Sequence, residues 1–248
     1  MVGSPVVSSP VVGTAVVSLR RRLLAEFVGC LLLAAAVVGS GIAAQTLSPH
    51  DVGLQLTENA VATALALFVL IAVLAPISGA HLNPIISIVD AALGRRPWRE
   101  VPGYAAVQLV GCAAGVMLAN LMFGHPPVTI SEHARLSPPH VLAEVVATAG
   151  LVMVVFVLAR SGRERLAPAA VAAYIGAAYL FTSSTSFANP AITVGRIFSN
   201  TFAGIDPASA AGFIVAQLVG GVAGFLLVRA LVPAQTHVPA RDQEGAHP

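Results

Sequence analysis

The fold is decided by the stretch Ser78-Gly79-Ala80-His81-Leu82-Asn83-Pro84-Ile85, which returns later in the chain as Phe187-Ala188-Asn189-Pro190-Ala191. Proline fits the first turn of a helix because its missing N–H has no intrahelical partner there, and asparagine is a good N-cap. Each Asn-Pro pair therefore predicts the start of a helix. The apolar runs that follow, Ile85–Leu93 and the run to about Ser199, are too short to cross a bilayer. Each predicts a half-helix that enters the membrane and ends near its surface.

The Asn-Pro turns belong to a series of three markers that occurs twice in the same order. Leu24-Ala25-Glu26 precedes the first turn and Leu142-Ala143-Glu144 the second; Gln108-Leu109-Val110-Gly111 and Gln217-Leu218-Val219-Gly220 follow them. One such match is easily produced by chance among Ala-, Val- and Gly-rich helices, but three in one order favour an internal repeat. Each half contains three spans, an odd number, so the second half is predicted to lie upside down relative to the first.

Composition places these repeats in a membrane. Apolar residues make up 56% of the chain and charged residues 10%, against roughly 25% charged in typical soluble domains. Six apolar stretches approach or reach the length of a membrane-spanning helix: Leu23–Ala43, Ala60–Ile77, Pro102–Phe123, His140–Ala159, Ala167–Thr182 and Ser209–Leu231. The predicted fold is an all-α membrane protein with six transmembrane helices plus two re-entrant half-helices in an inverted repeat.

The channel domain is expected at residues 23–232, with repeat one at 23–123 and repeat two at 140–232, between disordered cytoplasmic tails at 1–22 and 233–248. All 13 basic residues are arginine, and their positions orient the spans. Arg135 and Arg196 fall on one side of the predicted membrane. The other side has Arg20, Arg21, Arg22, Arg95, Arg96, Arg99, Arg160, Arg163, Arg165, Arg229 and Arg241. This asymmetry predicts a multi-pass protein of the cell membrane with both termini in the cytoplasm.

Several functional classes are disfavoured by the residues present. A chain without lysine has no P-loop lysine and no Schiff-base lysine. Cys30 and Cys112 fall inside predicted spans, and the histidines between the repeats lack the spacing of a metal site. We therefore expect no enzyme, metal, cofactor or nucleic-acid partner. A coupled transporter needs a titratable group at the midplane, and the nearest candidate, Asp90, lies near the cytoplasmic end of the first half-helix.

A cavity is expected where the two half-helices meet. Non-helical backbone at membrane depth is tolerated only where protein buries it or where it lines a water-filled space. Both helix N-termini would point at that space with partial positive charge, which discourages cations. The carboxamides of Asn83 and Asn189 would offer hydrogen-bond donors to a passing oxygen. These features predict a pore for small uncharged solutes.

The combination of motifs resembles the aquaporins, members of the major intrinsic protein family, over Leu23–Val232. The resemblance is carried by both Asn-Pro motifs and by Ala25-Glu26-Phe27-Val28-Gly29, Gln108 with Gly111, Ala143-Glu144, and Gln217 with Gly220. It implies a homotetramer with one pore in each subunit, surrounded by lipid. It also implies structural roles: Glu26 and Glu144 would accept hydrogen bonds from the re-entrant loops, the alternative being a proton relay. Gln108 and Gln217 would brace the same loops.

The resemblance assigns His81 to the cytoplasmic vestibule, the alternative being a loop histidine bonded to backbone. Two residues depart from the family pattern. The first motif has Ile85 where the family usually has alanine, which adds bulk beside the central constriction. In the family, an arginine usually follows the second motif, and its side chain narrows the outer filter. Ile192 occupies that position here. Arg196, one turn further out, either reaches toward the missing position or extends to water at the outer mouth.

The remaining filter positions are Thr63, Ser186 and one residue in Gly176–Tyr179, taken as Ala177. Such a filter is wide and weakly polar. The chain is similar in this region to a bacterial branch associated with arsenic resistance, which implies passage of water, glycerol-sized polyols or undissociated metalloid acids such as arsenite. A water-selective aquaporin is the alternative.

Overall fold

The computed structural model of the protein describes residues 17–232, and these residues form helices and connecting loops without a strand. The α-helices are α1 (Leu19–Leu47), α2 (Val52–Ser78), α3 (Pro84–Ala92), α4 (Val101–Met122), α5 (Pro138–Arg160), α6 (Ala167–Phe181), α7 (Pro190–Arg196) and α8 (Pro207–Leu231). Short 3₁₀ helices, Trp98–Glu100 and Glu164–Leu166, lead into α4 and α6.

Six of these helices are long, and α3 and α7 are the two half-helices. Among the described residues, α1, α2, α4 with its leading 3₁₀ turn, α5 and α8 are long and apolar enough to cross a membrane. Helix α6 has 15 residues, fewer than the roughly 20 that span a bilayer, and the 3₁₀ turn before it extends its reach. The predicted all-helical fold with two half-helices is confirmed.

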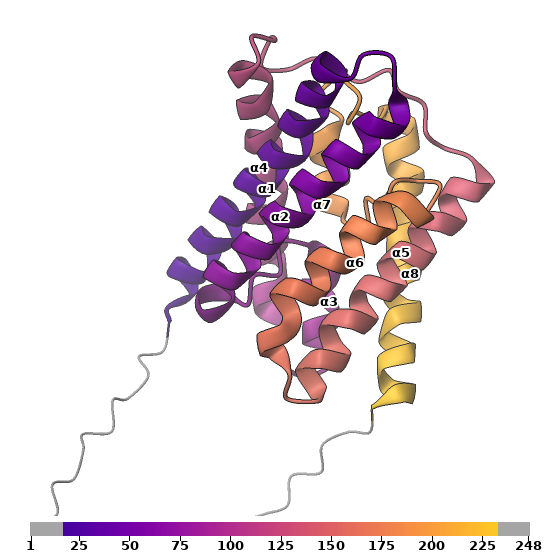
Figure 1. Ribbon diagram of the computed structural model, residues 1–248. Coiled ribbons are helices and arrows are strands. Elements are labelled where there is room, and N and C mark those ends of the chain that lie inside the picture. Colours follow the sequence, from indigo (N-terminus) through magenta and orange to yellow (C-terminus); the bar gives the residue numbers. More distant parts are fainter. Residues whose placement is uncertain (1–16, 233–248) are drawn as a thin grey trace, which may run out of the picture.

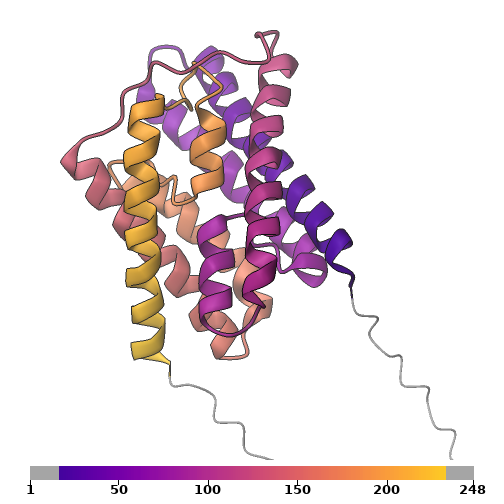
Figure 2. The same ribbon diagram turned by 180° about the vertical axis from the view of Figure 1, so that it is seen from behind.

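The two halves pack side by side with the half-helices between them (Figures 1 and 2). Helix α1 packs against α2 and α4 in the first half, α5 against α8 and α6 in the second, and α2 against α6 across the halves. From behind, α3 and α7 lie between α8 and α4 and approach each other from opposite ends. The chain enters α1 and leaves α8 at the same end of the molecule.

The crossings α1·α4 and α5·α8 depend on matching glycines. A Cβ placed on Gly111 would lie 2.6 Å from the carbonyl oxygen of Phe27, and one on Gly220 would lie 2.6 Å from the carbonyl oxygen of Val145. Only glycine fits where a helix backbone approaches this closely. Because Phe27 and Val145 follow Glu26 and Glu144, the same crossing sets both glutamates at equivalent places in the two halves.

The N-terminal boundary differs from the expectation. Residues 1–16 and 233–248, most of the two expected tails, lie outside the described residues. Within the first expected tail, however, α1 already begins at Leu19. The guanidinium of Arg22 forms two 2.8 Å hydrogen bonds with the Glu100 carboxylate, which ties the first turn of α1 to the start of α4.

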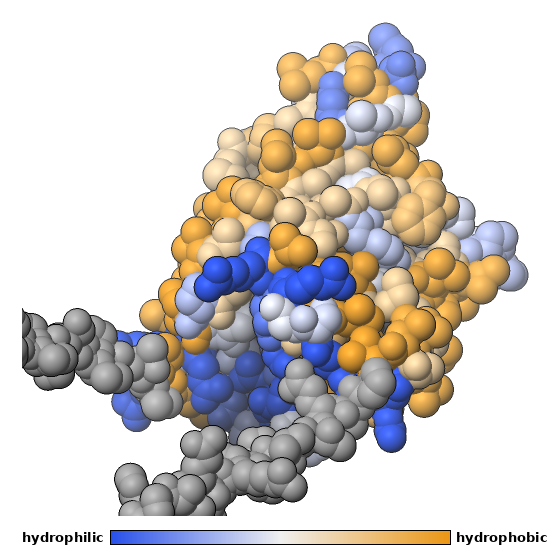
Figure 3. Space-filling model, turned by 60° about the horizontal axis from the view of Figure 1, so that its bottom comes forward, coloured by the Kyte–Doolittle hydropathy of each residue, from blue (hydrophilic) through white to orange (hydrophobic). Residues whose placement is uncertain are grey.

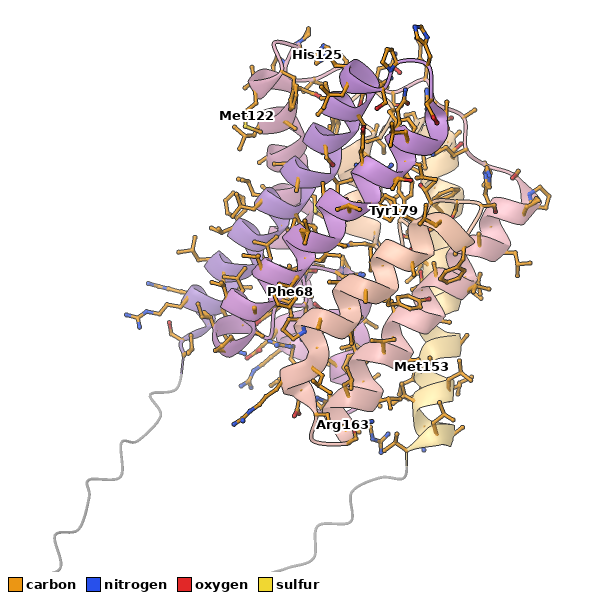
Figure 4. The ribbon with its side chains drawn as sticks, viewed as in Figure 1. Phe68, Met122, His125, Met153, Arg163 and Tyr179 are labelled. Carbon is orange, nitrogen blue, oxygen red and sulfur yellow. The ribbon has the colours of Figure 1, made fainter. Side chains whose placement is uncertain are left out.

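The outer surface of the helices has many large apolar side chains. Phe68 and Met122, labelled in Figure 4, are 44% and 61% exposed. His125 lies at one end of the molecule and Arg163 at the opposite end. Exposed large apolar side chains occur on all six long helices. Because soluble monomers rarely expose large apolar patches, we expect this surface to face lipid.

Candidate pore

A cavity of about 430 Å³ runs between the two halves. One face of α2 and one face of α6 line it at every fourth residue, as expected for one side of a helix. These lining residues are Thr63, Leu67, Ile71 and Ala75 on α2, and Ala167, Val171, Ile175 and Tyr179 on α6. The walls are therefore apolar along most of their length, and polar side chains gather at the re-entrant loops and at the ends.

Asn83 and Asn189 lie at the tips of the half-helices and line this cavity. The Asn83 side-chain oxygen accepts from the N–H of Ile85 at 2.9 Å, and that of Asn189 accepts from the N–H of Ala191 at 2.9 Å. Each side chain thus caps its own helix. Each Nδ2 then donates across the centre, Asn83 to the carbonyl of Ala188 at 2.8 Å and Asn189 to that of Leu82 at 2.7 Å. The two carboxamides are fixed, with one Nδ2 hydrogen of each left for another acceptor.

A buried glutamate holds the loop before the first half-helix. The carboxylate of Glu26 accepts from the Ser78 hydroxyl at 2.6 Å, from the backbone N–H groups of His81 and Leu82 at 2.9 and 2.7 Å, and from Gln108 Nε2 at 2.8 Å. Leu82 has a φ of 50°, which a residue with a side chain rarely adopts. The four bonds compensate for this backbone strain.

Glu144 forms the equivalent contacts in the second half. It accepts from the Ser184 hydroxyl at 2.6 Å, from the N–H groups of Phe187 and Ala188 at 2.9 Å each, and from Gln217 Nε2 at 2.7 Å. Ala188 has a φ of 47°. Both glutamates are fully buried, and the four hydrogen bonds that each accepts offset the cost of burying the carboxylate.

The glutamines connect the loops to the half-helices. Gln108 Nε2 also donates to the Ser87 hydroxyl on α3 at 3.1 Å, and Gln217 Nε2 donates to the Thr193 hydroxyl on α7 at 2.9 Å. Thr193 in turn donates to the carbonyl of Asn189 at 2.8 Å. The Gln side chains therefore hold each half-helix against its loop.

The end of the cavity near the C-terminus of α3 is lined by charged side chains. His81 lines it, with Nδ1 3.0 Å from the Ser87 hydroxyl and Nε2 3.4 Å from Asp90. Asp90 also pairs with Arg95 and Arg96, at 3.2 Å each. Figure 3 shows hydrophilic residues gathered around the recess at this end. The His81 ring bonds side chains rather than backbone, and Asp90 lies at the mouth rather than at the centre, where a coupled transporter would need it.

At the opposite end, the α6 residue that lines the cavity differs from the one expected in the outer filter. Ala177 is exposed on the outer surface of α6 and does not line the cavity. Tyr179 does: its hydroxyl lies 3.3 Å from that of Thr63, and Figure 4 shows it on α6 toward the upper end. The assignment to Ala177 was wrong because a step of two residues turns a helical side chain to the far face.

Arg196 is buried at this end and does not extend to water. Its side chain lines the cavity and is 2% exposed. The guanidinium carbon lies 3.5 Å from the centre of the Phe187 ring, and Nε donates to the carbonyl of Ala203. Several buried side-chain polar atoms in residues 17–232 have no hydrogen-bond partner, and Arg196 Nη1 and Ser186 Oγ are two of them. Both atoms belong to residues that line the cavity.

The two isoleucines that depart from the family pattern have different surroundings. Ile192 lines the cavity. Ile85 is 2% exposed but is not among the lining residues, and it packs against α8, where a Cβ on Gly221 would lie 2.7 Å from it. The bulk of Ile85 therefore fills a helix contact instead of the central constriction. Ala191, its counterpart in the second motif, is fully buried outside the lining.

Two functional candidates were missed from sequence. Tyr179 lies within the expected range Gly176–Tyr179, but the smaller Ala177 was assigned to the filter. The α6 residues that line the cavity recur at every fourth position from Ala167, and this spacing leads to Tyr179. Phe187 was treated only as part of the motif, although it lines the cavity beside Arg196. Only the fold brings the Phe187 ring and the guanidinium together.

An inverted repeat of helices around a cavity, with two asparagine-capped half-helices meeting inside it, defines a membrane channel. The major intrinsic protein family model matches residues 14–186. The aquaglyceroporin AqpS of Rhizobium meliloti (strain 1021) is 45% identical over 92% of this chain and 97% of its own length. Aquaporin NIP3-1 of Oryza sativa subsp. japonica is 32% identical over 94% of this chain and 72% of its own.

The fold has a solved relative as well. The X-ray structure of the aquaglyceroporin from Plasmodium falciparum superposes with a TM-score of 0.64, at 20% identity, over 85% of this chain and 94% of that one. The chain belongs to the major intrinsic protein family, a family of channels rather than enzymes, and it is an integral membrane protein.

Proposed function

We propose that this protein is a passive channel for water and for small uncharged solutes up to about the size of glycerol. The observation that carries the proposal is the pair of fixed carboxamides, Asn83 and Asn189, inside an otherwise apolar passage. A neutral hydroxyl oxygen accepts from these donors, which offsets part of the cost of leaving water. An ion would lose far more hydration than these groups replace.

The distribution of charge in the cavity agrees with this selection. The charged lining residues lie at the two ends: Asp90, Arg95, Arg96 and Glu164 at one and Arg196 at the other. Between the ends a solute meets neutral side chains and the N-termini of α3 and α7, whose partial positive charge repels cations. Among the described lining residues, none at the centre is charged.

The residues of the outer filter fall into two groups that favour different solutes. Ile192 in the usual arginine position and the small Ser186 favour glycerol-sized solutes, and the most similar relatives reported above include an aquaglyceroporin. The second candidate is a water-selective channel, which the Tyr179–Thr63 contact and the buried Arg196 favour because both reduce the opening. We place Thr63, Tyr179, Ser186, Ile192 and Arg196 in this filter.

Undissociated arsenite belongs with glycerol in the proposal. It is neutral at physiological pH and presents hydroxyl groups on a compact centre, so the same donors that serve a polyol serve it. Arg196 Nη1 and Ser186 Oγ, which lack a hydrogen-bond partner and belong to lining residues, are the donor and the donor-acceptor that we propose for such a solute.

We further propose a homotetramer in the cell membrane, with one pore in each subunit and both termini in the cytoplasm. Arg163, in the Arg-rich loop between α5 and α6, lies at the end of the molecule where α1 begins and α8 ends, whereas Arg135 belongs to the α4–α5 loop, which has His125 at the opposite end. Cysteines placed at Gly94 and at Pro126 are expected to react with impermeant reagents from opposite sides.

The experiment is stopped-flow light scattering on proteoliposomes challenged in turn with sucrose, glycerol and arsenite. Shrinkage in sucrose faster than in empty vesicles measures water flux, and the later reswelling measures solute influx. Fast reswelling in glycerol supports the leading proposal, and water flux without reswelling supports the water-selective alternative. If the vesicles reswell in glycerol but not in arsenite, metalloid acids are removed from the proposal.

A further inference from the structure

Arg135 lies in the loop between the two halves and is held firmly there. Its backbone N–H and that of Leu136 donate to the Ser209 hydroxyl at 2.8 and 2.9 Å, and its carbonyl oxygen is bonded to His140 Nδ1. Its side chain then extends back toward the outer end of the pore. It is not among the residues that line the cavity, so it does not meet a solute itself.

The Arg135 guanidinium binds the segment that follows α7. Nε donates to the carbonyl of Gly204 at 2.7 Å, and Nη2 donates to that of Phe202 at 2.6 Å. The carbonyl between them, on Ala203, accepts from Arg196 Nε. Three consecutive carbonyls are thus shared between two arginines, with Arg135 on the outer two and the filter residue Arg196 on the middle one.

The two arginines share a ring as well. The guanidinium carbons of Arg196 and Arg135 lie 3.5 and 5.6 Å from the centre of the Phe187 ring. Phe187 is fixed in turn by an edge-to-face contact with Phe213, with ring centroids 5.2 Å apart. Arg135 therefore contacts the same ring as Arg196, and it binds the carbonyls on both sides of the one that accepts from Arg196.

We propose that Arg135 is the positioning residue of the outer filter: it fixes the Phe202-Ala203-Gly204 carbonyls and thereby holds the Arg196 guanidinium across the pore. Through Arg196 it sets the ratio of glycerol to water permeability. This inference rests on the proposed channel function. Its chemistry is electrostatic and geometric, since a guanidinium donates in two fixed directions to two acceptors at once.

Removal of the Arg135 guanidinium leaves two carbonyls without their charged donor. The segment relaxes toward other donors, because an unpaired buried acceptor is costly. The Ala203 carbonyl then moves away from Arg196 Nε, and the guanidinium is no longer fixed against the Phe187 ring. The filter widens, and glycerol, the larger solute, gains more than water.

The test is a double-mutant cycle on the glycerol-to-water permeability ratio in proteoliposomes, with Arg135→Met, Arg196→Leu and the double variant. Arg135→Met is expected to raise the ratio by at least about twofold, the lower end of coupling within one hydrogen-bond network. Arg196→Leu is expected to raise it as well. The double variant is expected to have the same ratio as Arg196→Leu alone, because the side chain that Arg135 positions is then absent.

Two further variants make the outcome decisive. Arg135→Lys keeps the charge but loses the two fixed donor directions of the guanidinium, so it is expected to raise the ratio as well, by less than Arg135→Met. It takes the place of Arg135→Met in the cycle if that variant does not fold. Arg99→Gln removes one exposed arginine far from the filter and is the matched control. An unchanged ratio in Arg135→Met, or the same factor with and without Arg196, overturns the proposal. Wild-type vesicles that conduct neither water nor glycerol overturn the channel function instead.

Discussion

The two re-entrant loops are held by matching contacts, but the half-helices that follow them end in different surroundings. Glu26 and Glu144 each accept two backbone N–H groups, one serine hydroxyl and one glutamine amide. At the far end of α3, however, Asp90 is surrounded by His81, Arg95 and Arg96. At the far end of α7, Arg196 is buried against an aromatic ring and a carbonyl.

This difference separates what builds the pore from what selects its solute. The strained backbone before each half-helix needs the same carboxylate in both halves, so those contacts are equivalent. The half-helix ends face opposite sides of the membrane, and there the halves have different side chains. Changes to the shared contacts are therefore expected to affect both halves alike, and changes at the ends to affect selectivity alone.

The largest effect is expected from Glu26→Ala and Glu144→Ala. Each removes the acceptor of four hydrogen bonds, and each buried donor left unpaired costs about 1–3 kcal/mol. Both variants are expected to lose the folded channel to a similar degree, measured by monodisperse yield in detergent and by thermal unfolding. If one variant folds normally while the other does not, the equivalence of the two loops is wrong.

Asn83→Asp and Asn189→Asp come next. A carboxylate has no amide donor, and its charge must be desolvated inside the pore. Water and glycerol flux are expected to fall by about tenfold or more in each variant, which is about 1.4 kcal/mol or more of added barrier. Normal flux through folded protein in either variant would remove the asparagine pair from the mechanism.

A more selective effect is expected from Ile192→Arg at the outer end. A guanidinium beside Thr63 and Ser186 takes up space while still offering donors to water, so glycerol flux falls much more than water flux. Because the like charge of Arg196 displaces the new side chain, the double change with Arg196→Leu is measured beside the single one. An equal fall of both fluxes in both variants would place the constriction elsewhere.

The smallest effect is expected at the inner mouth, from Glu164→Gln. Its pair with Arg95 spans 3.7 Å, and the two side chains are 56% and 41% exposed. Exposed pairs of this kind contribute about 0–1 kcal/mol, so flux and thermal stability are expected to stay close to wild type. A strong loss of flux would show that the inner mouth controls permeation, contrary to the comparison above.

The sequence was sufficient for the half-helices because their signals are local. An N-cap asparagine followed by proline, and a run too short to span, lie within a few residues of one another. The inverted orientation of the second half followed from the odd number of spans, three, predicted in each half. Both predictions needed no knowledge of which side chains meet across the fold.

The filter was harder to predict because it depends on tertiary contacts. Helix α6 is apolar on all sides, since one face meets lipid and another the pore wall, so no amphipathic stripe marks the register that brings Tyr179 inward. The burial of Arg196 depends on Phe187 and Ala203. Ile85 was assigned to the constriction because its packing against Gly221, far along the chain, is invisible in the local sequence.

The most direct test of the central claim measures water and proton flux on the same proteoliposomes, water by stopped-flow light scattering and protons by an entrapped pH-sensitive dye. A passage lined by neutral donors between two helix N-termini predicts water flux well above that of empty vesicles with proton flux no greater than theirs. Folded protein that conducts protons, or that leaves water flux at the empty-vesicle rate, would contradict the account.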